Sequence, residues 1–199
     1  MNTRNIYKSI RSYATVFAAA LVLGTTFYGC NQFDLDEDPG KSQLAVLPYA
    51  SQAELELAVT GTYNRMWAAL RMTTAWVSGW GGDDLTTHRA SNKADFREYD
   101  QRSVSLGNAR TANTWRGVYQ AIRAANTVLV NAAETNLSNR QAQDDLVGQA
   151  YFIRGYLFHH MARIHGRIPL VLGIVPDFEI GLASQEGVYK QIERDYVSA

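Results

Sequence analysis

Aromatic, acidic and amide side chains gather between residues 76 and 112, where the sequence shows no helical period. This mixture suits a carbohydrate, because an indole or phenol ring stacks on the apolar C–H face of a sugar. Carboxylate, guanidinium and amide groups then bind the hydroxyl rim with directional hydrogen bonds. The candidate glycan-binding residues are Trp80, Asp83, Asp84, Arg89, Asn92 and Tyr99. An equally open interpretation is that Trp76 and Trp80 anchor this long connection to the hydrophobic core.

Catalysis is a weaker interpretation of the polar residues. Asp83 and Asp84 are adjacent, whereas the two carboxylates of a glycoside hydrolase face each other across a gap of at least ~5 Å. His159, His160 and His165 lack the i, i+4 spacing of a zinc peptidase helix, so we expect half-buried histidines in a helix interface. The sequence contains no phosphate loop, no nucleophile elbow and no paired-cysteine motif. We therefore expect no enzyme, no metal site and no cofactor.

Residues 1–29 are predicted to be a signal peptide. A basic stretch precedes an apolar run, residues 13–28, that is short for a membrane span. The run ends at Cys30, the only cysteine of the chain, which is explained if its thiol carries lipid. The alternative is a small buried cysteine behind an ordinary N-terminal anchor.

Residues 30–50 are predicted to be an acidic tether that is too polar to form a core. Asp34, Asp36 and Asp38 resemble the start of a calcium loop, but Pro39 and Ala45 stand where that loop needs glycine and glutamate. After residue 29 the chain holds 16 basic side chains (19 − 3) and 19 acidic ones, a net charge of −3. This balance argues against a nucleic-acid partner, because phosphate binding needs clustered lysine and arginine.

The longest helix is predicted to run from an N-cap at Ser138 to a left-handed Gly166, with Pro169 just beyond it. Its apolar residues recur at steps of three and four, which is one face of a helix. They are Leu146, Ala150, Ile153, Leu157, Met161 and Ile164. We expect the rest of the fold to pack around this helix.

Three further helices are predicted on either side of it. A capping box at Ser51 and Glu54 begins the first, Asn113 or Thr114 begins the second, and Ser184 begins the last. The second and the longest helix are joined by a short turn, so we expect an all-α fold of antiparallel pairs with one long irregular loop. Four placements follow from the pattern: Trp67 in the core, Gly61 at a close helix contact, Asn126 at the edge of a buried face and Arg154 pairing between helix layers.

The motifs occur in an order that resembles the SusD/RagB family of outer-membrane nutrient-binding lipoproteins. They are the signal that ends at Cys30, ELELAVTGTYNRMW (54–67), GGDDLTT (81–87), TWRGVYQAIRAANTVL (114–129), GQAYFIRGYLFHHMARIHGRIPLV (148–171) and VYKQIERDYVSA (188–199). The resemblance covers only the family's N-terminal part. It implies that residues 51–199 form the N-terminal helical portion of a SusD-like fold, truncated at its C-terminal end and built on tetratricopeptide-like helix pairs.

The same resemblance implies a function. It predicts a lipid-anchored protein on the outer face of the outer membrane that captures glycans and delivers them to a SusC-like TonB-dependent transporter, without catalysis. Two alternatives stay open: a peptide-uptake protein of the same fold, and a helical-repeat scaffold that binds only proteins.

Overall fold

The computed structural model describes residues 47–71, 82, 85–90, 92–175 and 177–199, which lie in the compact unit Val46–Ala199. In this part of the chain the regular structure is helical and no strand occurs. The helices are α2 (Gln52–Leu70), α3 (Ala94–Asp100), α4 (Ala109–Ala133), α5 (Arg140–His165) and α6 (Gln185–Val197). The predicted all-α fold class is therefore confirmed.

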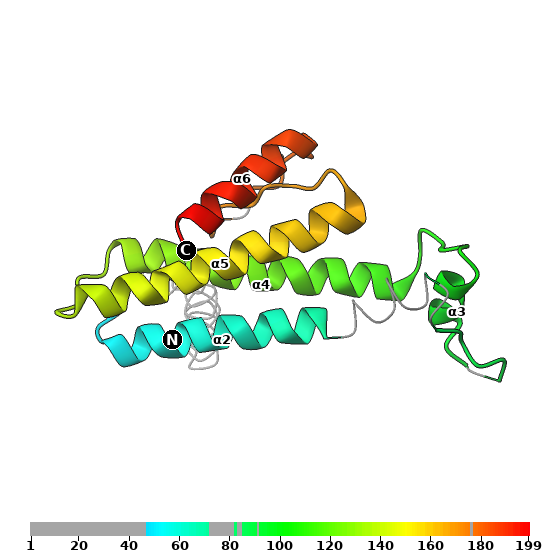
Figure 1. Ribbon diagram of the computed structural model, residues 1–199, viewed down its shortest axis with the longest axis horizontal. Helices are drawn as coiled ribbons and strands as arrows, with labels where there is room; N and C mark the ends of the chain where they lie inside the picture. Colours follow the sequence, from blue (N-terminus) through cyan, green and yellow to red (C-terminus); the bar gives the residue numbers. More distant parts are fainter. Residues whose placement is uncertain (1–46, 72–81, 83–84, 91, 176) are drawn as a thin grey trace, which may run out of the picture. The chain divides into compact units, whose positions relative to one another are not determined.

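Helices α2, α4 and α5 lie side by side, and α6 packs on α5 (Figure 1). The chain reverses direction between α2 and α4 and again between α4 and α5, so each of these pairs is antiparallel (Figure 1). Helix α6 is antiparallel to α5 as well, since Tyr189 contacts His159 while Tyr196 lies against Gly155. The arrangement confirms antiparallel pairing and is compatible with tetratricopeptide-like helix pairs.

Local capping sets most of the helix ends that the sequence predicts. The hydroxyl of Ser51 accepts from the Glu54 amide at 3.3 Å, and the Glu54 carboxylate accepts from the Ala50 amide at 2.8 Å. Gly166 ends α5 with a φ of 72°, and its amide donates to Ala162. Ser184 caps α6 by accepting from the Gly187 amide. These side chains satisfy amides that a helix start leaves without partners.

Two predicted helix caps are wrong, and one helix was not predicted. Helix α4 is capped by Asn108 rather than by Asn113 or Thr114, because the Asn108 side chain accepts from the amides of residues 110 and 111. Helix α5 is capped by Asn139 and not by Ser138. The expectation that residues 76–112 carry no helix fails at α3, a seven-residue helix too short to show an amphipathic period.

Helix α5 supplies the centre of the hydrophobic core. Ile153, Leu157, Phe158 and Met161 are fully buried, as the spacing predicts for three of them. They pack against residues of α4, α6 and the end of α2: Val118, Ala121, Ile122, Val188, Ile192 and Leu70. A second cluster at the opposite end of the pairs consists of Leu55, Val59, Val128, Ala132 and Ala150.

Two predicted placements on α2 are wrong. Trp67 is 66% exposed, because it lies about 80° around the helix axis from the buried Val59. A Cβ atom on Gly61 would meet nothing within 4 Å, so this glycine marks no close contact. The stripe that α2 does bury runs through Leu55, Val59, Thr62 and Leu70.

A buried polar cluster, the Arg154 network, joins three helices. Arg154 donates to both carboxylate oxygens of Asp195, at 2.9 and 2.6 Å, and to the side-chain oxygen of Asn126 at 3.0 Å. Asn126 is fully buried rather than half-buried, and its amide donates to the carbonyls of Val171 and Gly173. The predicted structural pairing of Arg154 is confirmed, and the network also fixes the connection that follows α5.

Candidate functional site

The predicted site residues, one for lipidation and six for ligand contact, divide into two groups. Cys30, Trp80, Asp83 and Asp84 lie outside the described residues. The other three, Arg89, Asn92 and Tyr99, are described. Their roles as ligand contacts therefore stay predictions, and only the second group has a geometry to report.

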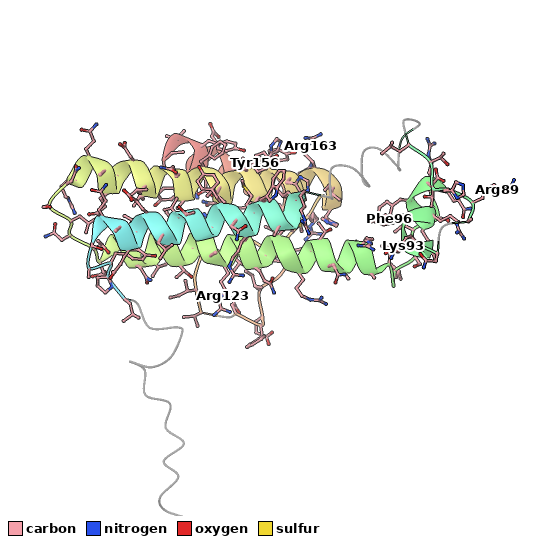
Figure 2. All side chains as sticks on the ribbon, turned by 90° about the horizontal axis from the view of Figure 1, so that it is seen from below. Arg89, Lys93, Phe96, Arg123, Tyr156 and Arg163 are labelled. Carbon is pink, nitrogen blue, oxygen red and sulfur yellow. The ribbon has the colours of Figure 1, made fainter. Side chains whose placement is uncertain are left out.

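Arg89 and Asn92 are exposed on the segment that precedes α3. Figure 2 shows Arg89 at the outer edge of this segment, beyond Lys93 and Phe96. The segment is tied to α3 through Asp100, whose carboxylate accepts from the Thr86 hydroxyl at 3.0 Å and from the Thr87 amide at 3.1 Å. Both exposed side chains are thus placed on a connection that α3 holds in position.

Tyr99 has a structural contact in place of a free hydroxyl. Its oxygen lies 2.5 Å from the Thr111 hydroxyl, which joins α3 to the first turn of α4. Burial raises the pKa of Tyr99, and the hydrogen bond with Thr111 opposes that shift. The phenol is therefore neutral at physiological pH, and its hydroxyl is engaged by Thr111.

Further contacts between α3 and the start of α4 form a unit that we call the α3–α4 joint. Arg110 pairs with Asp95 at 2.5 Å, and its guanidinium lies 4.3 Å from the centre of the Phe96 ring. Asn108 caps α4 with its oxygen and donates its amide hydrogens to the Asp95 carbonyl and to Glu98. The Asn108 and Ser105 hydrogen bonds lower the pKa of Glu98, so that carboxylate stays ionised. The joint ties the segment before α3 to the N-terminal end of α4.

An open depression, the α4 depression, follows one face of α4 from this joint. It is lined by Ala112, Trp115, Arg116, Tyr119, Gln120 and Arg123. The rings of Trp115 and Tyr119 lie 5.1 Å apart, and His165 contacts the Trp115 ring edge-on at 5.0 Å. Tyr119 donates its hydroxyl to the Pro169 carbonyl at 2.9 Å, and burial raises its pKa strongly. Both rings are thereby held in fixed orientations.

Sequence reasoning missed this depression. The hydrophobic period assigns Trp115 and Tyr119 to the core face of the helix, and both do contact the core. Each is nevertheless only partly buried. The signal that could have found the site is the run of long polar side chains beside the two rings, Arg116, Gln120 and Arg123, at helical spacing.

The histidines of α5 are not arranged as metal ligands. In the described ranges, no three His, Cys, Asp or Glu side chains are grouped closely enough to hold a metal ion. His159 contacts the Tyr189 ring, and His165 contacts Trp115. The Nε2 atom of His160 is buried and has no hydrogen-bond partner among the described residues.

Acidification is expected to destabilise the fold through His160 and His165. Burial lowers the pKa of both imidazoles below 6.5, and nearby Arg163 adds to the effect at His160. Because the unfolded chain then binds more protons than the folded one, the free energy of unfolding falls as pH drops below 6.5. Urea unfolding measured from neutral to mildly acidic pH should show this decline, and His160→Gln should reduce it.

His88→Gln is the matched control, because His88 is exposed on the segment before α3. This variant should keep the wild-type pH dependence. A decline that His160→Gln leaves unchanged would assign the proton uptake to other groups.

The comparison with known families decides what kind of protein this is. Residues 35–199 match a SusD-like family described as starch-binding associating with outer membrane. The chain belongs to the SusD-like family. The family resemblance that the sequence motifs predict is therefore confirmed over 165 residues (199 − 35 + 1).

Curated SusD-like proteins of Formosa agariphila and Bacteroides ovatus are similar to this chain. SusD-like protein P2 of Formosa agariphila is 27% identical over 173 residues, which cover 83% of this chain and 32% of the relative. SusD-like protein P25 of the same organism is 25% identical over 152 residues, covering 71% and 28%. A SusD-like protein of Bacteroides ovatus is 27% identical over 160 residues, covering 76% and 28%. The chain spans about a third of the length of these relatives.

Solved structures of the SusD superfamily share the fold. A laminarin-binding SusD-like protein superposes with a TM-score of 0.66 at 16% identity, over 75% of this chain and 34% of that one. A SusD superfamily protein of Bacteroides vulgatus gives 0.63 at 21% identity, over 76% and 34%. A crystal structure described with xylogluco-oligosaccharide gives a TM-score of 0.62 at 22% identity, over 73% of this chain and 29% of that one.

Among the described helices, none is both long and apolar enough to cross a bilayer.

Proposed function

We propose that this chain is the N-terminal helical portion of a surface lipoprotein that binds glycans without catalysis and passes them to a SusC-like TonB-dependent transporter. The observation that carries the proposal is the SusD-like match over residues 35–199, within a family described as starch-binding associating with outer membrane. Two solved relatives of the same fold are described with laminarin and with xylogluco-oligosaccharide, which supports glycans as the ligand class.

The proposal divides the chain into three parts. Residues 1–29 are a signal peptide, residues 30–50 are a tether that begins at a lipidated Cys30, and residues 51–199 are the helical portion. Several acyl chains at Cys30 anchor a protein stably, because each buried CH₂ contributes about 0.8 kcal/mol. The tether then leaves the helices on the outer surface of the outer membrane.

The candidate ligand contacts precede α3 in the sequence, except Tyr99, which lies in α3. Trp80 supplies an indole for stacking, while Asp83, Asp84, Arg89 and Asn92 supply polar groups for sugar hydroxyls. The joint supports this role because it ties residues 86–111 to α3 and α4 by side-chain hydrogen bonds. A connection held in this way loses less conformational entropy when a ligand binds.

Cells that produce the full chain are expected to retain fluorescent laminarin or xyloglucan oligosaccharides on their surface. Cys30→Ser should abolish this retention, because the chain is no longer anchored. Trp80→Ala should weaken it about three- to tenfold, the effect of losing one aromatic stacking contact. Flow cytometry of intact cells over a range of glycan concentrations measures both effects.

Trp67→Ala provides a tryptophan control, since Trp67 is exposed on α2 outside the candidate segment. It should leave retention unchanged.

A large β-barrel protein is expected to co-purify from detergent-solubilised outer membranes. Binding of peptides in place of every glycan tested would favour the peptide-uptake alternative and overturn the glycan assignment.

A further inference from the structure

The α4 depression carries a charge that the rest of the helix does not balance. Over its 25 residues α4 contains three arginines and no aspartate or glutamate. Arg110 pairs with Asp95 in the α3–α4 joint. The other two, Arg116 and Arg123, both line the depression and are both exposed.

Neither of these two arginines is in an ion pair with another described residue. Among the described residues, the only side-chain hydrogen bond of these two arginines runs from Arg116 to the neutral side-chain oxygen of Asn113, at 3.1 Å. None of the residues that line the depression is acidic. Figure 2 shows Arg123 on the edge of α4 that faces away from α5, where solvent reaches it. Two guanidinium groups are therefore available to an anionic ligand.

The geometry of the helix places the arginines at a distance that suits one short ligand. Seven residues separate Arg116 and Arg123, which is about two turns and about 10 Å along the same face. Trp115 and Tyr119 lie beside the arginines and are one turn apart. His165 and Pro169 fix their rings. Gln120 adds an amide between the two charges.

These groups make two kinds of contact at once. The rings offer apolar surface to the C–H face of a pyranose. The guanidiniums pair with carboxylate or sulfate oxygens in bidentate geometry, and the amide binds a hydroxyl. A neutral sugar would use the rings and the amide but would leave both guanidiniums without an anionic partner.

We propose that the α4 depression is a subsite for acidic glycans, in which Trp115 and Tyr119 stack on a sugar ring while Arg116 and Arg123 bind the carboxylate or sulfate groups of neighbouring units. This inference rests on the proposed glycan-binding function and specifies the ligand class. It adds residues of α4 to the candidates that precede the helix.

The test compares an acidic oligosaccharide with its methyl ester, in which each carboxylate is neutralised. Isothermal titration of the full chain, solubilised in detergent, uses oligogalacturonate and its fully methyl-esterified form. The acidic form should bind about tenfold more tightly at low salt, as two charge-assisted hydrogen-bonding groups would give. High salt should remove most of this preference, because ions screen exposed charges.

The double variant Arg116→Gln with Arg123→Gln should lose the preference while keeping affinity for the methyl ester. Glutamine preserves part of the aliphatic stem, so the fold should be retained, which circular dichroism checks. The matched control removes the same charge elsewhere, with Arg65→Gln on α2 and Arg163→Gln on α5. In Figure 2 Arg163 and Arg123 lie on opposite edges of the bundle.

Each remaining outcome counts against a specific claim. Equal affinity for the two ligands would overturn the acidic subsite while leaving the proposed glycan-binding function intact. Loss of the preference in the control double variant would assign it to net charge and not to the depression. Competition by oligoglutamate as effective as oligogalacturonate would show an unspecific anion site and would overturn the stacking role of Trp115 and Tyr119. Absence of binding to any glycan would overturn the proposed function itself.

Discussion

Asp195→Ala is expected to lower the free energy of unfolding by about 3–5 kcal/mol, because it leaves the buried charge of Arg154 without a charged partner. The two side chains are 8% and 1% exposed, and two hydrogen bonds connect them. The Gln191 amide, which donates to Asp195 at 2.9 Å, also loses its acceptor. Urea unfolding followed by circular dichroism measures the change.

The exposed pair Lys190–Glu186 provides the control on the same helix. Its side chains are 63% and 76% exposed, so Lys190→Ala should change stability by only about 0.5 kcal/mol or less. A combined Arg154→Met and Asp195→Leu variant should recover much of the loss, since no charge then stays buried. A decrease below about 1 kcal/mol for Asp195→Ala would contradict the assignment of Arg154 as a fully desolvated charge.

Phe158→Ala is expected to cost about 3–5 kcal/mol, the range for removing a large aromatic side chain from a packed core. Phe158 is fully buried in the C-terminal half of α5, in the cluster that joins α4, α5 and α6. Its removal leaves a cavity that the surrounding helices fill only in part. Urea unfolding measures this loss. A lower midpoint concentration with an unchanged m-value would show that only the stability has changed.

Phe152 serves as the comparison because it is the same residue type on the same helix. It is 45% exposed and stacks against Tyr156 and Tyr196 at the surface. Phe152→Ala should cost about 1 kcal/mol or less, the value of an exposed aromatic pair. Similar losses for the two variants would show that α5 buries a different face from the one described.

The helices illustrate how far local information reaches. Ser51, Gly166 and Ser184 mark helix ends through contacts within four residues, and the apolar spacing of α5 identifies Ile153 and Leu157 as core. The wrong placements lie where more than one choice satisfies the local pattern. Asn108 and Asn113 can both cap a helix, and only the contacts of Asn108 with Asp95 and Glu98 in α3 favour the earlier start.

In the candidate site, too, local sequence predicts some features and tertiary contacts decide the others. The sequence identifies a segment with the right residue types, and Arg89 and Asn92 are exposed there as a binding role requires. It could not show that Tyr99 uses its hydroxyl on Thr111, twelve residues away, because that contact depends on how α3 meets α4. It also could not distinguish the buried surface of Trp115 and Tyr119 from the part that lines the α4 depression.

By itself the sequence determined the helical class, the core stripe of α5, the family and the absence of a familiar catalytic motif. These features depend on residue type and on contacts a few positions apart. Only the tertiary structure decided the partners of Arg154 and Asn126, which lie 41 and 45 residues away along the chain. The physical reason is that a buried charge or amide must find its partner wherever the packed helices bring one, and periodicity along a single helix carries no record of its neighbours.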